Sequence, residues 1–439
     1  MKKILIAGAG HGGLAVAAFL AEKGYDVRLY ERKRSQDLGY DWDDAISNKT
    51  FSCLGIDFNN KDVMPRESAA FYSPSLKTPV IVNFPPEETT YEIQRKVMYR
   101  YLLINAEKKG VKMYFDSNIS KALISGDNKV MGIIVDGEEI AGDLVIDSAG
   151  MYSPVRSSLP ESYKMIEGFG RGEVFHTYRA IFDLLPDKPI TNADKFNFYF
   201  RFNNIEGIAW YKIVDGRADI LIGSVVPLTE DEIAVHIEEL RKAQPSIGRK
   251  LLAAGYVSDI PLRAAFSVMT GDNYAAIGDA VSMTIPINGS GITNSICAGR
   301  MLADTIIDIN LRKTSYSKEN LWNYQVRYMK EIGADMISVD IIKRCILTYP
   351  SEIIDYFFDR GIIAAKELLA GALGYEMKLS LRETLEKLFQ GFMKLPMLIR
   401  LNNALLKSRR AKQHVLKIPN VYHCNAIEKW ADKYEAFLK

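Results

Sequence analysis

The chain contains 439 residues with a formal net charge of +2, and 48% of the residues are hydrophobic while 25% are charged. These proportions are ordinary for a globular protein of two or three domains, and so small a charge gives no argument for nucleic-acid binding. The four cysteines have neither a zinc-type spacing nor a pairing pattern, which favours structural burial in a reducing cytoplasm and no metal site; they are Cys53, Cys297, Cys345 and Cys424.

The chain opens with a predicted strand, a glycine-rich loop and a helix. The apolar run that ends at Ala7 predicts a short buried strand, and a helix is predicted over 14–23. Three glycines between them permit a tight turn, close approach of the backbone to a pyrophosphate, and close packing of the helix on the strand; they are, in that order, Gly8, Gly10 and Gly13. The free N–H groups and the positive dipole end of the helix would then bind phosphates without a basic side chain.

A second strand is predicted over 26–30 and places Glu31 at its tip. Glu31 follows the glycine loop by about 20 residues, the spacing at which a carboxylate accepts hydrogen bonds from an adenosine ribose. Strand, loop, helix, strand and acid agree with one another. We therefore predict a dinucleotide site that includes Glu31 and the adjacent Arg32.

The middle of the chain first extends this domain and then changes character. A helix is predicted from Arg95 to Lys109, followed by another parallel strand, and a buried strand over 143–147 ends in a turn of small residues that brings backbone close to a ligand. From Val174 to Val226, stretches of alternating aromatic and β-branched residues predict an antiparallel sheet. Helices are predicted again from Thr293 onward.

A second glycine-rich signature runs from Gly278 and Asp279 to Gly291, with Pro286 and Gly289 between them. A dinucleotide-binding start that is closed by a Gly-Asp segment hundreds of residues later is typical of chains that bind FAD, and NAD-only dehydrogenases lack this ending. We therefore predict FAD as the cofactor.

The predicted fold class is α/β: an FAD-binding Rossmann-like domain with an inserted antiparallel-sheet substrate domain and a helical C-terminal region. The three parts are expected at 1–70, 91–160 and 261–310 for the discontinuous FAD-binding domain, 71–90 and 161–260 for the substrate-binding domain, and 311–439 for the helical region.

These signatures occur in the same order, over about the first 310 residues, as in the FAD-dependent superfamily of aromatic hydroxylases, and the chain most resembles its geranylgeranyl reductase branch. The resemblance implies that Arg95 contacts the flavin nucleotide and that Gly278 and Asp279 bind the ribityl chain and pyrophosphate. It also places a turn beside the isoalloxazine ring and points backbone N–H groups at the flavin N1–C2=O edge, where a helix dipole stabilises the anionic reduced flavin; the residues concerned are Pro286, Gly289, Gly291 and Ile292.

Two departures from the superfamily bear on the reaction. Aromatic hydroxylases carry an aspartate where this chain has Ala149, and that aspartate is tied to the binding of pyrophosphate and pyridine nucleotide. Its replacement by alanine favours reduction over hydroxylation. The nearby Asp147 either takes part in that binding or only caps the end of the strand. Trp210 and Tyr211 resemble the reductase unit that lines a lipid pocket, but Lys212 begins a pair that replaces the usual Phe-Pro. The two aromatic residues are therefore either pocket walls or strand core.

Other replacements argue against halogenation, because Ile208 and Ile213 stand where flavin halogenases carry a second tryptophan and a proline. Phe198 and Phe200 are expected to supply a second apolar surface.

The catalytic acid is not identified by any motif. Tyr40 and Asp41 follow the predicted ribose-binding strand and can transfer a proton, and Trp210 is the third catalytic candidate. Asp43 or Asp44 either lines the active site or caps a helix. His11 is expected to face the nucleotide from the phosphate loop.

The C-terminal region contains an apolar pattern at helical spacing with a basic stretch behind it. The apolar residues are Leu381, Leu385, Leu388, Phe389, Phe392, Met393, Leu398, Ile399, Leu405 and Leu406, and the basic residues are Lys407, Arg409, Arg410 and Lys412. Such a helix either packs on its own domain or lies on an anionic membrane surface.

We therefore expect an FAD-dependent oxidoreductase that reduces C=C bonds of an apolar, isoprenoid-like or aromatic substrate, with NAD(P)H or a ferredoxin-type protein as electron donor. The alternative is a monooxygenase that hydroxylates or epoxidises such a substrate. A non-catalytic prenyl-binding escort protein is a third reading, against which the intact glycine signatures weigh. The chain begins directly with the first strand and has no apolar run of about 18 residues, so a cytoplasmic location is expected, with attachment to a membrane surface left open.

Overall fold

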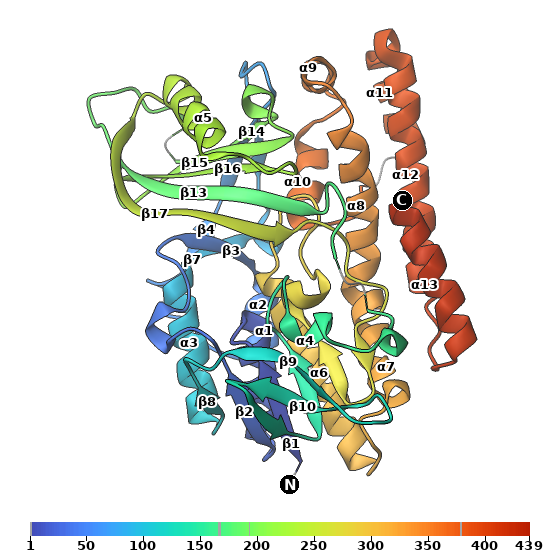
Figure 1. The fold of residues 1–439 in the computed structure, drawn as a ribbon. Coiled ribbons are helices and arrows are strands. Elements are labelled where there is room, and N and C mark those ends of the chain that lie inside the picture. Colours follow the sequence, from blue (N-terminus) through green and yellow to red (C-terminus); the bar gives the residue numbers. More distant parts are fainter. Residues whose placement is uncertain (1, 166–167, 193, 378–379) are drawn as a thin grey trace.

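The computed structural model describes residues 2–165, 168–192, 194–377 and 380–439 (Figure 1). An α/β domain lies at the bottom of Figure 1, a large sheet at the upper left, and a group of helices at the right. The predicted fold class is confirmed: a Rossmann-like domain, a largely antiparallel sheet and a helical C-terminal region are all present.

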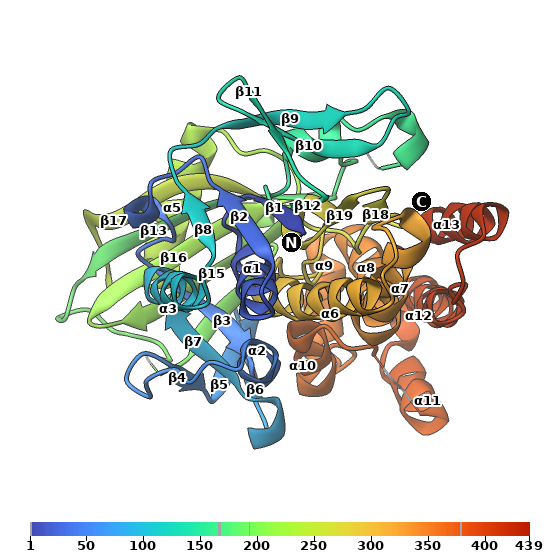
Figure 2. The ribbon, with the colours of Figure 1, turned by 90° about the horizontal axis from the view of Figure 1, so that it is seen from below.

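The Rossmann-like domain is built on a six-stranded sheet in the order β18-β19-β12-β1-β2-β8. β1 pairs in parallel with both β2 and β12, as the two buried apolar runs predicted. The strands are β1 (Lys3–Ala7), β2 (Asp26–Tyr30), β8 (Lys112–Tyr114), β12 (Leu144–Asp147), β18 (Thr270–Gly271) and β19 (Tyr274–Ala276). An antiparallel sheet beside it contains β9 (Ile119–Ile124), β10 (Val130–Val135) and β11 (Glu138–Ala141) (Figure 2).

Helices α1 (His11–Glu22) and α6 (Ile292–Leu311) lie side by side against this sheet (Figure 2). Their close approach depends on glycine: a Cβ on Gly12 would meet the carbonyl oxygen of Ser295 at 2.6 Å, and one on Gly299 would meet that of Gly12 at 2.8 Å. Helix α3 (Arg95–Lys108) packs against α1 as well. Both glycine-rich signatures thus lead into helices that share one face of the sheet.

The substrate-side sheet has seven strands in the order β17-β13-β16-β15-β14-β5-β6. Its pairings are antiparallel except that β14 runs parallel to β5, a strand from the early part of the chain that the aromatic pattern could not reveal. The strands are β5 (Ser68–Tyr72), β6 (Val80–Asn83), β13 (Val174–Leu184), β14 (Phe196–Phe200), β15 (Gly207–Val214), β16 (Arg217–Ser224) and β17 (Ile247–Pro261). The domain limits themselves remain a prediction.

The two faces of this sheet pack on different partners. One face is covered by α5 (Glu230–Ala243), whose start is a capping box in which Thr229 and Glu232 bond to each other's backbone. The other face turns toward the Rossmann-like domain and the C-terminal helices. A three-stranded sheet of β3 (Asp43–Ser47), β4 (Met64–Arg66) and β7 (Thr90–Gln94) lies at the junction, followed in the chain by α2 (Asn48–Leu54).

Among the described residues after Lys318 every regular element is a helix, as expected for a helical C-terminal region. Its helices are α7 (Lys318–Tyr328), a π-helix (Met329–Gly333), α8 (Ala334–Leu347), α9 (Ser351–Asp359), α10 (Ala365–Leu373), α11 (Leu381–Gln390), the 3-10 helix η7 (Phe392–Lys394), α12 (Leu395–Leu416) and α13 (Cys424–Leu438). Within the described ranges, none of the helices has the length and apolar character needed to cross a membrane.

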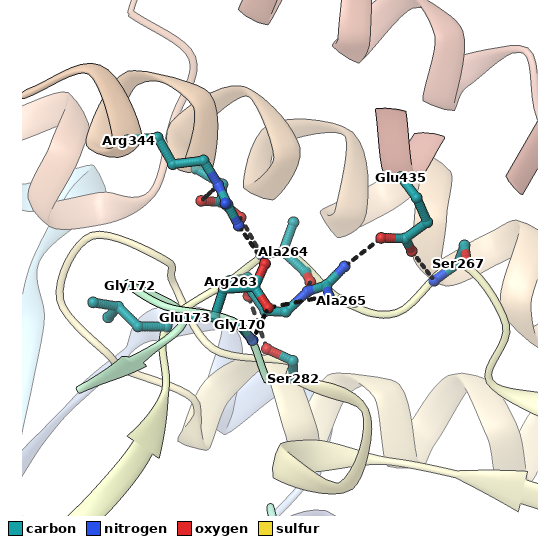
Figure 3. Close-up of polar contacts among 12 residues, drawn as sticks. Gly170, Gly172, Glu173, Arg263, Ala264, Ala265, Ser267, Ser282, Arg344 and Glu435 are labelled. Atoms are coloured by element: carbon teal, nitrogen blue, oxygen red, sulfur yellow. Dashed lines mark hydrogen bonds and ion pairs between the residues drawn. The ribbon is translucent and has the colours of Figure 1, made fainter. Parts of the chain in front are cut away.

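A buried ionic network attaches these helices to the rest of the molecule (Figure 3). Arg263, which is 4% exposed, pairs with Glu173 at 3.4 Å and with Glu435 of α13 at 2.7 Å. Arg344 of α8 joins Glu173 at 2.7 Å and the fully buried Asp340 at 2.9 Å. Removing one partner would leave a buried charge uncompensated, so the network holds α8 and α13 in one arrangement against the sheet.

Candidate functional site

A cavity of about 770 Å³ lies where the three parts of the molecule meet. It begins at the glycine loop beside Gly10, passes under the cavity face of the seven-stranded sheet at Trp210, and continues between the C-terminal helices as far as Ile362 and Leu401. Its volume lies within the range of small-molecule and cofactor sites. Its lining thus offers a glycine-rich end for a cofactor and an apolar stretch along the rest.

The glycine loop has the geometry that phosphate binding requires. Gly8 adopts φ +91°, which is open to glycine at no steric cost, and a Cβ there would meet the backbone of Ser148 at 2.6 Å. A Cβ on Gly13 would meet the carbonyl oxygen of Gly8 at 2.7 Å, so this glycine serves packing, as predicted. Gly10 lies on the cavity wall and precedes α1, whose first turn contains no acidic side chain. The free N–H groups at this helix start therefore meet no competing carboxylate.

Backbone N–H groups hold the carboxylate of Glu31 beside this loop. Its carboxylate accepts hydrogen bonds from the N–H groups of Ala9 at 2.8 Å and Lys33 at 2.9 Å. Glu31 and the exposed Arg32 both line the cavity. A carboxylate fixed in this way keeps lone pairs free for ribose hydroxyls.

The second glycine signature closes the same end of the cavity. Gly278, Asp279, Gly289, Gly291 and Ile292 all line it, whereas Pro286 lies in the turn that shapes it. The turn is tied by a bond from the N–H of Ile285 to the carbonyl of Ser290 at 2.8 Å, and α6 begins directly after Gly291 without an acidic residue in its first turn. Burial raises the pKa of Asp279 and Arg95 opposes the shift.

Arg95 stands between these two signatures. It forms an ion pair with Asp44, and its guanidinium lies 5.2 Å from the ring centroid of Tyr40. Burial raises the pKa of Asp44, but Arg95 and Arg179 outweigh burial and hold it below its usual value.

His11 packs on Tyr99, with the ring centroids 4.6 Å apart. Burial, reinforced by Arg95, lowers the pKa of His11 to about 3, and its Nε2 is buried without a partner among the described residues. The imidazole is therefore neutral at physiological pH, with one unpaired nitrogen beside the phosphate loop.

An ionic cluster joins the junction sheet to the seven-stranded sheet. Arg179 is 6% exposed, bonds to both carboxylate oxygens of Asp219 at 3.0 and 2.7 Å, and donates to the backbone carbonyl of Asp43 at 2.8 Å. It also reaches Asp44 at 3.3 Å. No motif identifies this residue in the sequence, although an arginine among the aromatic and apolar residues of 178–182 is a signal.

Lys212 and Glu92 complete the cluster. Lys212 is 4% exposed and pairs with Glu92 at 2.7 Å, while Glu92 also pairs with Arg66 at 2.8 Å. Burial raises the pKa of Glu92, but Arg66 and Lys212 together lower it to about 2. Lys212 is thus part of a salt bridge between the seven-stranded sheet and the junction sheet. Asp43 and Asp44 lie in β3 and on the cavity wall, so neither caps a helix.

The register of β15 places Trp210 and Tyr211 on opposite faces of the seven-stranded sheet. Trp210 is 6% exposed, lines the cavity, and packs at 4.7 Å against both Phe196 and the guanidinium of Arg179. Tyr211 is fully buried on the opposite face, under α5, where its hydroxyl lies 3.1 Å from that of Ser246. Of the two alternatives, Trp210 therefore lies in the pocket wall and Tyr211 in the strand core, because successive side chains of a strand point to opposite faces. Phe198 and Phe200 do line the cavity.

The proton-transfer candidates lie in different surroundings. Tyr40 is on the cavity wall, stacked on Trp42 at 4.2 Å. Asp41 pairs with Lys96 at 2.7 Å and lines a separate small pocket. Catalytic roles for Tyr40, Asp41 and Trp210 remain predictions.

Of the two roles expected for Asp147, the structure shows the cap at the end of a strand. It is fully buried and accepts hydrogen bonds from the N–H of Ala149 at 3.0 Å and from the hydroxyls of Ser153 and Tyr274 at 2.6 and 2.8 Å. Burial raises its pKa. Asp147 therefore caps the end of β12 and shapes the turn that faces the cavity.

The prediction that the cysteines are unpaired is wrong for two of them. Cys53 of α2 and Cys297 of α6 form a disulfide with their Cα atoms 5.3 Å apart, while Cys345 and the exposed Cys424 are free. A separation of 244 residues hides the pairing from the sequence, because only the packing of α2 on α6 brings the two together. Cys297 lines the cavity. Disulfides are rare in a reducing cytoplasm, so the cysteines do not support that location.

Comparison with known proteins agrees with this geometry. A family model described as an FAD binding domain matches residues 1–309. The chain is 22% identical over 428 residues to the digeranylgeranylglycerophospholipid reductase of Sulfolobus acidocaldarius, covering 95% of this chain and 93% of that protein.

Two solved structures share the fold. A geranylgeranyl bacteriochlorophyll reductase-like protein from Thermoplasma acidophilum matches with a TM-score of 0.73 at 18% identity, over 92% of this chain and 99% of that one. The probable FAD-dependent monooxygenase pqsL from Pseudomonas aeruginosa matches with a TM-score of 0.60 at 18% identity, over 82% of this chain and 99% of that one. The prediction of FAD is confirmed, and the chain belongs to the FAD-binding domain family as an FAD-dependent oxidoreductase.

Proposed function

We propose that the protein reduces C=C bonds of an apolar, isoprenoid-like substrate. The observation that carries this proposal is the length of the apolar cavity, which continues from the cofactor end past Trp210 and Phe198 to Ile362 and Leu401. A long chain of carbon atoms fits such a cavity better than a compact aromatic ring does. The relative from Sulfolobus acidocaldarius, similar along nearly its whole length, is named as a reductase of a lipid with two geranylgeranyl chains.

The chain's own residues divide the work. The helix starts at Gly10 and Gly291, together with Glu31, would hold FAD, which when bound and reduced supplies the hydride. Trp210 and its aromatic neighbours exclude water and press the substrate against the cofactor end. Tyr40, on the cavity wall beside Arg95, would deliver the proton that completes saturation of the double bond. Asp41, paired with Lys96, is the less suitable donor.

Monooxygenation is the second candidate, and the likeness of fold to pqsL favours keeping it. The two reactions differ in their need for oxygen. The deciding experiment supplies chemically reduced enzyme with geranylgeraniol under strictly anaerobic conditions and analyses the product by mass spectrometry. A product heavier by two hydrogen atoms supports reduction. A product that forms only in air and carries label from isotopic oxygen would establish the monooxygenase instead, and binding without any product would favour the escort protein.

The electron donor and the location are part of the same proposal. NAD(P)H or a ferredoxin-type protein would reduce the cofactor, and the rate of flavin bleaching with each donor separates them. An enzyme attached to the membrane surface by its C-terminal region would meet an apolar substrate where it resides. Cell fractionation tests this location.

A further inference from the structure

The corner between α11 and α12 exposes an unusual amount of apolar surface. We call the segment 385–399 the α11–α12 corner. Its exposed side chains are Leu385 at 59%, Phe389 at 81%, Phe392 at 66%, Met393 at 64%, Leu395 at 45% and Ile399 at 50%. Single exposed apolar residues are common on proteins, but six large ones within fifteen consecutive positions are a concentration typical of an interaction site. The side chain of Leu381 lies outside the described part of the chain.

Capping, hydrogen bonds and side-chain packing hold the corner in place against the loop of Gly361 and Ile362. Ser380 and Glu383 cap the start of α11. Lys387 donates to the carbonyl oxygens of Gly361 and Ile362, both at 2.9 Å. Leu398, at 5% exposure, packs inward against the same loop. The predicted apolar pattern therefore divides into an anchored inner row and an exposed outer row.

The chain is basic after Glu386, the one acidic residue of the corner, which pairs with Arg382 at 2.8 Å. From Lys387 to Ile427 inclusive there are eight Lys and Arg residues and no Asp or Glu. Of the basic residues singled out in the sequence, Lys412 is bound to Asp335 at 2.6 Å and to Glu376 at 2.9 Å. Lys394 and Arg400, by contrast, are exposed within or next to the corner. Basic residues beside an apolar patch are the combination that binds anionic lipid surfaces.

The corner also lies over the far end of the cavity. Phe357, Phe358, Ile362, Ile363 and Leu401 line that end, and the loop of Ile362 is the one that Lys387 holds. Leu388 of α11 and Leu401 of α12 pack in the same cluster as Ile362. An apolar molecule leaving a bilayer at the corner would thus have only this thin layer of side chains to pass before it reached the cavity.

We propose that the α11–α12 corner docks on an anionic lipid bilayer and that the lipid substrate enters the cavity beneath it. The entry step rests on the proposed reduction of an isoprenoid lipid, whereas the docking does not depend on that reaction. A bilayer fits better than a second copy of the chain, because a two-fold contact would place the same basic stretch against itself. Docking through this face points the cavity's far end at the lipid and its cofactor end away from it.

The test uses the full-length protein and the double variant Phe389→Gln/Phe392→Gln, with Val235→Gln/Leu311→Gln as a matched control. The control removes two side chains that are 55% and 77% exposed and lie on α5 and α6. Flotation with vesicles of phosphatidylcholine and phosphatidylglycerol should show binding of wild type and control, and at least about a tenfold lower bound fraction of the corner variant. Binding should also weaken with added salt and with pure phosphatidylcholine.

Equal flotation of wild type and corner variant would overturn the proposal. A dimer in sedimentation velocity that the corner variant abolishes would overturn it too, because the patch would then serve a second copy. For entry, the corner variant should lose turnover of an isoprenoid lipid presented in vesicles while keeping that of geranylgeraniol in detergent micelles; parallel loss of both would refute entry at this corner. Vesicle binding through the corner without any alkene reduction would refute the proposed function and leave docking intact.

Discussion

Replacing Trp210 by alanine separates its two roles, because the side chain is both packed in the sheet and exposed to the cavity. The change removes an edge contact with Phe196 and a cation–π contact with Arg179, both at 4.7 Å. Such contacts contribute about 0.5–1.5 and about 2 kcal/mol when desolvated. Together with the cavity that is left, we expect the free energy of unfolding to fall by about 3–5 kcal/mol.

The same change enlarges the cavity beside the substrate, so the dissociation constant for geranylgeraniol should rise while FAD content stays nearly constant. Denaturant unfolding followed by circular dichroism and ligand titration on the same preparation measure both effects. Trp210→Phe is the control, since it keeps an aromatic ring and should cost about half as much. An unchanged dissociation constant in the folded Trp210→Ala protein would remove this side chain from the substrate site, and a stability loss below about 1 kcal/mol would contradict its place in the core.

Four further outcomes are expected. Gly10→Val should abolish FAD binding, because a side chain there would occupy the space of the pyrophosphate and meet Ser148; wild-type cofactor content in this variant would refute the site. Asp279→Ala should weaken FAD by about 1–3 kcal/mol in isothermal titration without unfolding the protein, and unchanged affinity would show that the Gly-Asp match was misread. The pKa of Glu92 is lowered from 4.5 to about 2, so the stability that its ionised form gives the fold is present above pH 4.5 and is lost as pH falls toward 2. Glu92→Gln should lower the free energy of unfolding by about 3 kcal/mol at pH 7 and should flatten its decrease in acid. Parallel plots of unfolding free energy against pH for wild type and variant would count against the ion pairs. Unreduced, denatured protein should titrate two free thiols, and Cys53→Ser/Cys297→Ser should lower the unfolding free energy by about 2–5 kcal/mol; four free thiols would disprove the disulfide.

The parts of the fold that follow from local pattern could be predicted from the sequence. The strand before Gly8, the helix after it and the carboxylate of Glu31 lie within one short stretch, so their spacing alone implies their geometry. The same holds for the turn before α6, where the first helical residue, Ile292, is one position from the predicted start. These elements form most of the cofactor end of the cavity.

What depends on contacts between distant segments could not be predicted. The pairing of Arg179 with Asp44 joins residues 135 positions apart, and the disulfide joins residues 244 apart. Trp210 and Tyr211 are adjacent in the sequence, and only the register of β15 against its neighbours decides which of them faces the cavity. The functional assignment of these side chains therefore needed the tertiary structure.

Arg179 has a consequence for how molecules reach and leave the cavity. Its guanidinium is clamped between Trp42 and Trp210 at 4.7 Å from each, and it bridges Asp219 of its own sheet to Asp44 of the junction sheet. If the seven-stranded sheet swung away like a jaw, a buried cation and a buried carboxylate would part, at a cost of about 3–5 kcal/mol for the uncompensated charge. The seven-stranded sheet is therefore expected to stay in place, and under the proposed function a long apolar substrate would move along the cavity beneath it.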